Sequence, residues 1–327
     1  MRFQFDDDQL ALRDAVRRFC AARADLAGVG ARENAPADGA VWQGLAELGV
    51  FGLLIPDESG DGWPVEAAIV FEELGRHLVS GPTIWSVIAA AYVDGCAEGE
   101  VRVAGVDTAL ASGAPLVVEH AAEADVIVLL GADGVALTER DDWTGGETGG
   151  PLDPLTPVTT YSAAPAGRAV GDAEVAHRLR LQGALLASAS LVGAAQGALD
   201  VAGSYALERE QFGVPIGTFQ AVKHLLADMY VRVELARAET YAAAAIMARP
   251  STGDVERSVR AAKLLAGEAG LANGRTAVQV LGGMGFTWDM LPHYYLKRSW
   301  VLDHAFGTGE SHAERLGSSV GDEVASR

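Results

Sequence analysis

The spacing of apolar residues changes twice along this 327-residue chain, near residue 101 and near residue 174. Before residue 101 and after residue 174, apolar residues recur every three or four positions, which is typical of amphipathic helices. Between them lie short apolar runs rich in Val, separated by Gly, Pro and Asp, which predict strands and turns. We therefore expect a mainly α protein with a small middle β domain, divided into residues 1–100, 101–173 and 174–327.

The N-terminal part is predicted to be all-helical. Helical spacing covers residues 9–22, a second stretch beginning near Trp42 and stopped by Pro56, residues 65–78, and a segment between Pro82 and Gly95.

The middle part is predicted to be short and rich in turns. Its expected strands are residues 101–106, 115–118, 126–130, 135–137 and 158–161. Residues 141–157 are crowded with Gly, Pro and Thr and are expected to form a loop. These strand segments are too few for a complete barrel.

The C-terminal part is predicted to be a bundle of long helices. The helical stretches are residues 174–208, 218–247, 254–281 and a shorter one starting near His293. In the second stretch one apolar stripe is expected to be buried, formed by Phe219, Val222, Leu226, Met229, Val233 and Ala236.

The net charge limits the possible partners. With 25 basic and 44 acidic residues, the chain has a formal charge of -19. Nucleic acids and anionic membranes would repel such a surface. An anionic ligand must therefore be held by a few local Arg, Lys or helix N-termini.

The chain lacks other specialised signals. Its two cysteines, Cys20 and Cys96, have neither disulfide-scaffold nor zinc spacing, and its histidines form no metal motif, so no metal site is expected. The N-terminus turns acidic at once and does not look like a secretion signal. We expect a cytoplasmic protein with no membrane span.

A first candidate site follows the long helix that ends before Gly213 and Pro215. Arg209 lies at this junction, where its planar guanidinium could bind the oxygens of a diphosphate. The alternative is an Arg that caps helix carbonyls. The next helix starts near Thr218, a plausible N-cap.

A second candidate site is the sequence Gln-Val-Leu-Gly-Gly-Met-Gly-Phe-Thr at residues 279–287. Its glycines permit positive φ angles and close approach of a ligand, and the Gln279 amide can donate and accept hydrogen bonds. Because the segment follows a helix, it is not a Rossmann phosphate loop. A simple helix-ending turn is the alternative.

Taken together, these segments closely resemble the acyl-CoA dehydrogenase family. The resemblance lies in residues 205–229, residues 279–287 and Tyr295-Leu-Lys-Arg298, and it extends to residues 42–54 and Glu72-Glu-Leu-Gly-Arg76 near the N-terminus. It covers both helical parts and implies a flavoprotein that removes hydrogens from the α and β carbons of an acyl-CoA thioester. A carboxylate takes the α proton, FAD takes the β hydride, and an electron-carrier protein accepts the electrons.

The resemblance also implies cofactor contacts. In this family FAD lies across a subunit interface, with its diphosphate and adenosine held by the neighbouring subunit. Arg209 and Phe212 match one segment that reaches across, and Gln279, Gly282 and Gly283 match the other.

Other family features are missing. The middle part lacks the Thr-Glu and Gly-Ser pair and the Trp-Ile-Thr strand that hold the flavin ring; Thr138-Glu139 has no Gly-Ser partner. The two positions at which the family carries its catalytic Glu fall at residues 305–308 and 182–184, which contain no acid. Asp303 and Glu310 lie near the first position and could substitute.

These absences favour a division of labour. The chain resembles the short subunits of actinobacterial heteromeric (α2β2) acyl-CoA dehydrogenases, in which a full-length partner supplies the flavin-ring site and the Glu, and a bulky steroid side-chain acyl-CoA is a possible substrate. The alternatives are a self-sufficient homo-oligomeric enzyme and a scaffold that has lost FAD.

Overall fold

The computed structural model describes residues 4–56, 62–110 and 115–325. Four helices form its N-terminal part: α1 (Asp7–Arg23), α2 (Gly39–Glu47), α3 (Pro64–Arg76) and α4 (Thr83–Ala89). α1 begins with a capping box, in which the Asp6 side chain accepts from the backbone of Gln9 and the Gln9 side chain accepts from the backbone of Asp6. The four helices predicted here are confirmed.

The middle part consists of seven short strands in two sheets. They are β1 (Val103–Asp107), β2 (Leu116–Glu119), β3 (Val126–Leu130), β4 (Gly134–Glu139), β5 (Glu147–Thr148), β6 (Val158–Tyr161) and β7 (Arg168–Asp172). One sheet has the order β1-β3-β4-β7 and the other β2-β6-β5. The expected loop contains β5, and β7 was not predicted, because both strands are largely exposed and carry little apolar periodicity.

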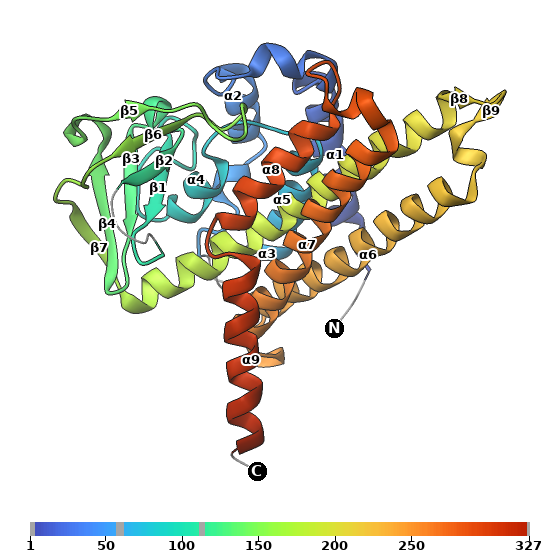
Figure 1. Cartoon of the computed structure of the whole chain (residues 1–327). Coiled ribbons are helices and arrows are strands. Elements are labelled where there is room, and N and C mark those ends of the chain that lie inside the picture. The colour runs from blue at the N-terminus through green and yellow to red at the C-terminus, as the bar shows by residue number, and fades with distance from the viewer. Residues whose placement is uncertain (1–3, 57–61, 111–114, 326–327) are drawn as a thin grey trace.

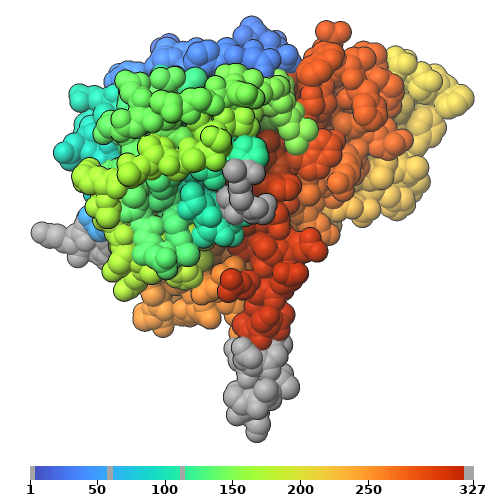
Figure 2. Space-filling view, turned by 60° about the vertical axis from the view of Figure 1, so that its left-hand side comes forward, coloured from blue at the N-terminus to red at the C-terminus, as the bar shows by residue number. Residues whose placement is uncertain are grey.

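The C-terminal part is a helical bundle, as predicted. Its helices are α5 (Ala173–Glu208), α6 (Gln220–Ala248), α7 (Val255–Leu281), α8 (Pro292–His304) and α9 (Gly309–Ala325), and a two-residue hairpin, β8 (Glu210–Gln211) and β9 (Val214–Pro215), joins α5 to α6. α5 to α8 run alternately up and down, and the hairpin lies at the end of the bundle far from the β sheets (Figure 1). α9 projects from the body of the molecule (Figure 2).

Two details of α6 differ from the sequence expectation. The N-cap is Phe219 rather than Thr218, whose hydroxyl donates to the carbonyl of Pro215 instead. The expected buried stripe holds only from Met229 onward, since Phe219 is exposed and Val222 is partly buried. The first turns of α6 thus extend beyond the packed part of the bundle.

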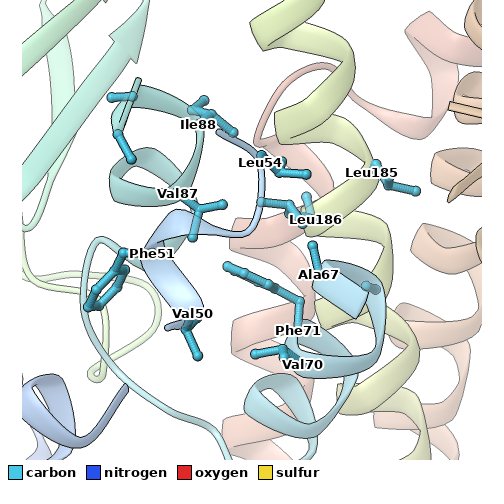
Figure 3. Packing of buried hydrophobic residues seen from close by; sticks show 14 of the residues in the cluster. Val50, Phe51, Leu54, Ala67, Val70, Phe71, Val87, Ile88, Leu185 and Leu186 are labelled. Atoms are coloured by element: carbon cyan, nitrogen blue, oxygen red, sulfur yellow. The ribbon is translucent and has the colours of Figure 1, made fainter. Parts of the chain in front are cut away.

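The helical parts share one large core. Phe71 of α3, Val87 of α4 and Leu186 of α5 pack in it together (Figure 3). The contact of α3 with α5 needs two glycines: a Cβ on Gly75 would lie 2.1 Å from the Ser190 carbonyl oxygen, and one on Gly193 would lie 1.9 Å from that of Glu72.

α5 is the central helix of this core. Within the described residues it alone is long and apolar enough to cross a membrane by length and composition, and 78% of its most apolar window is buried inside the protein. That degree of burial is expected of a core helix in a bundle of this kind.

Candidate functional site

The first predicted cluster forms the tip of the hairpin between α5 and α6. The backbone of Arg209 is fixed, because its N–H donates to the Tyr205 carbonyl and its own carbonyl accepts from Ile216. Its guanidinium is exposed and has no hydrogen bond or ion pair with the residues that the structure describes. The Arg209 side chain therefore does not cap helix carbonyls.

The hairpin turn presents an aromatic ring to solvent. Phe212 and Gly213 both have positive φ, 55° and 80°, as a two-residue hairpin turn requires. The Phe212 side chain is 94% exposed, and its only aromatic neighbour in the described chain is Phe219. The Phe212 ring is therefore free to contact another molecule.

The second predicted cluster lies at the same end of the bundle (Figure 1). Gln279 is exposed in the last turn of α7, and a short 3₁₀ helix, η7 (Gly282–Phe286), follows. Gly282 has a φ of 62°, and a Cβ on either Gly282 or Gly283 would meet no atom within 4 Å. Phe286, which is 81% exposed, adds a second ring to this end of the molecule.

Both clusters fit the diphosphate and adenosine portion of FAD. The N–H groups of the Arg209 guanidinium have no partner in the described chain and are available to phosphate oxygens. The glycines allow a ligand to approach the backbone of η7 closely. All five residues are exposed on the surface of the chain.

The positions at which the family carries its base meet inside this structure. Phe306, in the turn between α8 and α9, is 5% exposed and has a φ of 57°. A Cβ on Gly183 of α5 would lie 2.4 Å from the Phe306 ring, which also packs 4.8 Å from that of Trp85. An aromatic ring therefore fills the space between two positions that both lack an acid.

A buried polar cluster holds this turn in place. Lys263 of α7 donates to the carbonyls of Asp303 and Gly307, at 2.8 and 3.0 Å. Burial lowers the pKa of Lys263 to about 8. His312 of α9 donates from Nε2 to the Phe306 carbonyl at 3.2 Å, which leaves its Nδ1 to accept from Arg260. These four hydrogen bonds hold the turn that carries Phe306 and so keep its ring against Gly183.

Phe306 also lines a small cavity of about 60 Å³ where the three parts of the chain meet. Glu119, at the end of β2, lines it too, and burial raises the pKa of this carboxyl group. His120 beside it is oriented by Glu123, whose Oε1 is 2.5 Å from Nδ1. Burial alone would raise the pKa of Glu123, but bonds to His120, Arg102 and the Ala37 N–H outweigh it and lower the pKa.

The two candidate bases named from the sequence lie elsewhere. Neither Asp303 nor Glu310 lines the cavity. The Asp303 carboxylate lies against Gly267 of α7, and Glu310 is exposed in the first turn of α9. In the described residues no group of three His, Cys, Asp or Glu side chains could hold a metal ion.

Sequence reasoning missed the acidic lining of the cavity. Glu119 is the last residue of a strand, and nothing in its local pattern distinguishes it from a solvent-facing carboxylate. The pairing of Phe306 with Gly183 joins residues far apart in the chain and also has no local signature.

Sequence-family models match both helical parts. The acyl-CoA dehydrogenase N-terminal domain matches residues 6–99, and the acyl-CoA dehydrogenase C-terminal domain matches residues 174–321. Acyl-CoA dehydrogenase IpdE2 of Mycolicibacterium smegmatis is 32% identical over 284 residues, which cover 86% of this chain and 88% of IpdE2. The chain belongs to the acyl-CoA dehydrogenase family, whose members are oxidoreductases that act on CH–CH bonds.

A longer relative and two solved structures add context. Acyl-CoA dehydrogenase FadE34 of Mycobacterium tuberculosis is 35% identical over 332 residues, and this chain spans only 45% of it. The Tcur3481-Tcur3483 steroid ACAD (G363A variant) is 23% identical with a TM-score of 0.81, and the ChsE4-ChsE5 complex of M. tuberculosis is 24% identical with a TM-score of 0.80. Each match covers 98% of this chain and 99% of the matched chain, which establishes the fold over its whole length.

Proposed function

We propose that this chain is the short subunit of a heteromeric, FAD-dependent acyl-CoA dehydrogenase and lends cofactor contacts to a full-length partner. The observation that carries the proposal is the contrast between Phe306, which fills the position of a catalytic acid, and Arg209, which stands exposed and unpaired within the described chain. A chain built this way can hold a cofactor for another subunit, while residues 182–184 and 305–308, where the family resemblance places the base, contain no acid.

In this arrangement the residues of the chain bind and orient. Arg209 would bind the FAD diphosphate, Phe212 would pack on the cofactor or the partner, and Gln279 with Gly282 and Gly283 would receive the adenosine end. FAD, when bound, supplies the acceptor for the hydride that leaves the β carbon of the acyl-CoA. The partner supplies the Glu that takes the α proton, and an electron-transfer carrier protein is the expected electron acceptor.

The substrate class rests on similarity alone. The steroid ACAD and the ChsE4-ChsE5 complex share the fold, and each is named for two components. These similarities favour a hetero-oligomer of the α2β2 type that acts on a bulky, steroid-derived acyl-CoA in the cytoplasm.

Co-purification tests the proposal. We expect the chain alone to be colourless and inactive, and the complex with a full-length acyl-CoA dehydrogenase subunit to be yellow and to dehydrogenate acyl-CoA. A lone chain that binds FAD and turns over acyl-CoA would show instead a self-sufficient homo-oligomer using Asp303 or Glu310. A complex without flavin would show a scaffold.

Arg209→Ala in the complex tests the cofactor contact. A charge-assisted hydrogen bond contributes about 1.5–3 kcal/mol, so the Kd for FAD should rise about 10- to 100-fold while affinity for acyl-CoA changes little. Flavin fluorescence titration measures the Kd for FAD, and isothermal titration calorimetry measures the affinity for acyl-CoA. Arg249→Ala, which removes another exposed arginine at the opposite end of α6, should leave both constants unchanged. Equal FAD affinity in the Arg209 variant and the parent would refute the contact.

A further inference from the structure

Several arginines surround a cleft between α1, α3, α5 and α6. The cleft has a volume of about 350 Å³, within the size range of small-molecule sites. Four arginines line it: Arg13 and Arg17 of α1, Arg76 of α3 and Arg237 of α6. It lies on the side of α3 away from the small cavity, since Glu72, Glu73 and Arg76 face the cleft while Leu74 and Gly75 face the cavity.

Three of these arginines are held in the same way. A carboxylate binds the Nε and Nη2 edge of each: Asp14 for Arg13 at 3.1 and 2.9 Å, Glu73 for Arg17 at 3.1 and 2.6 Å, and Asp200 for Arg76 at 2.8 and 2.7 Å. The Nη1 nitrogen of each has no hydrogen-bond partner in the described chain and is not sealed from solvent. The carboxylates therefore fix the guanidinium planes and leave donors free.

The fourth arginine, Arg237, connects neighbouring helices through hydrogen bonds. Arg237 donates from Nε to Glu72, from Nη1 to Glu234 and from Nη2 to Gln196, so each of its nitrogens has a partner. Tyr241 donates to the second oxygen of Glu72 at 2.8 Å. These bonds tie α6 to α3 and α5 and keep the walls of the cleft at a fixed separation.

The acids that line the cleft are already neutralised. Glu73 is 2% exposed and binds Arg17, and Glu72 binds Arg237 and Tyr241. Five carboxylates bind the four arginines, those of Asp14, Glu72, Glu73, Asp200 and Glu234, so the cleft has no excess of positive charge. The capacity of the cleft to bind an anion therefore lies in the free Nη1 donors of Arg13, Arg17 and Arg76 in the described chain.

From this geometry we infer that the cleft binds a small polyphosphate anion, a role that does not depend on the proposed function. Several guanidinium donors around one space suit an anion with several oxygens, and forks already held by carboxylates lose little entropy on binding. A monovalent ion would leave most of the volume and of the donors unused. The ring of Phe5, edge-on to Tyr241 at 4.8 Å, gives one wall an aromatic surface for a nucleotide base.

The cleft is separate from the Arg209 hairpin. Asp200, which anchors Arg76, precedes Arg209 by nine residues on α5, which corresponds to about 14 Å along the helix axis. One ligand phosphate cannot reach both arginines, so substitutions distinguish the two sites.

Calorimetric titration of the full-length chain with inorganic diphosphate tests the inference, and ADP and coenzyme A in parallel titrations show whether a nucleoside adds affinity. The informative variants are Arg13→Ala and Arg76→Ala, because their partners Asp14 and Asp200 remain 47% and 39% exposed and tolerate the loss. Arg17→Ala is avoided because it would leave Glu73 buried and unpaired. Arg18→Ala removes the same charge from an exposed position on the same helix, outside the cleft.

We expect saturable binding of diphosphate that weakens about tenfold in Arg13→Ala and in Arg76→Ala and stays unchanged in Arg18→Ala and Arg209→Ala. Tighter binding of ADP than of diphosphate would identify a nucleotide as the ligand, and equal binding the phosphate groups alone. Absence of binding would overturn the inference. So would equal weakening by Arg18→Ala, which would indicate general charge attraction, or loss in Arg209→Ala alone, which would assign the binding to the hairpin.

Discussion

The two ends of α5 have opposite characters. In its N-terminal half, Gly183 lies against the ring of Phe306, which is 5% exposed and also packs against Trp85. Some 25 residues later, or about 37 Å along the axis, Arg209 and Phe212 project from the bundle with almost no contact to their own chain. One end is packed around Phe306, and the other is exposed to solvent and carries the proposed cofactor contacts.

This contrast separates what packing requires at one end of α5 from what it leaves free at the other. A protein interior is close-packed, and in the N-terminal half of α5 the aromatic ring of Phe306 fills the space between Gly183 and Trp85. An exposed hairpin contributes little to the core, so its sequence is free to serve a partner. Stability and cofactor binding should therefore respond to substitutions at opposite ends of the same helix.

The largest expected effect on stability is that of Phe306→Ala. Loss of a buried ring that contacts Trp85 and Gly183 should lower the free energy of unfolding by about 3–5 kcal/mol. The same substitution at the hairpin, Phe212→Ala, should change it by less than about 0.5 kcal/mol, because that ring is 94% exposed. Chemical denaturation of both variants measures the difference, and equal losses would contradict the contrast between the two ends.

A smaller effect is expected from acid. Burial, with Lys263 and Arg260 nearby, lowers the pKa of His312 to about 4 from the ordinary value of 6.5. The neutral ring is therefore favoured in the folded chain. The free energy of unfolding has its full value above pH 6.5 and decreases as the pH falls toward 4, because the unfolded chain then takes up a proton on His312 more readily than the folded chain does. Since one pKa unit corresponds to about 1.4 kcal/mol, the loss at pH 4 is about 3 kcal/mol.

Denaturation of the parent and of His312→Gln across this pH range isolates the contribution of His312. The parent should lose more stability than the variant between pH 6.5 and 4. Identical pH profiles would show that His312 is not held neutral and that the Phe306 turn is fixed by other bonds.

The sequence predicted what depends on local pattern. The helical stretches and the strands β1 to β4 and β6 follow from periodicity, and the glycines and Arg209 stand out because they interrupt it. β5 and β7 escaped prediction because they are exposed and short of apolar residues.

The features that were missed depend on tertiary contacts. Arg13 and Arg17 look like the polar face of an amphipathic helix, and only the packing of α1 beside α3 and α6 makes them the wall of a cleft. The filling of the family's acid position by Phe306 could not be predicted either, since it needs Gly183 from another helix.

The smallest effect considered is a single methyl group at the closed end of α5. In Gly183→Ala the new Cβ would lie 2.4 Å from the Phe306 ring, so the ring or the helix must shift, at a cost of about 1–3 kcal/mol. Gly203→Ala provides the matched control, since it lies on the same helix and its Cβ would meet nothing within 4 Å. There the better helix propensity of Ala should stabilise the chain by up to about 1 kcal/mol. Opposite signs at the two glycines, measured by denaturation, would locate the tight packing at Gly183 and Phe306. A loss at Gly183 that persists in the Phe306→Ala background would assign the crowding to another neighbour.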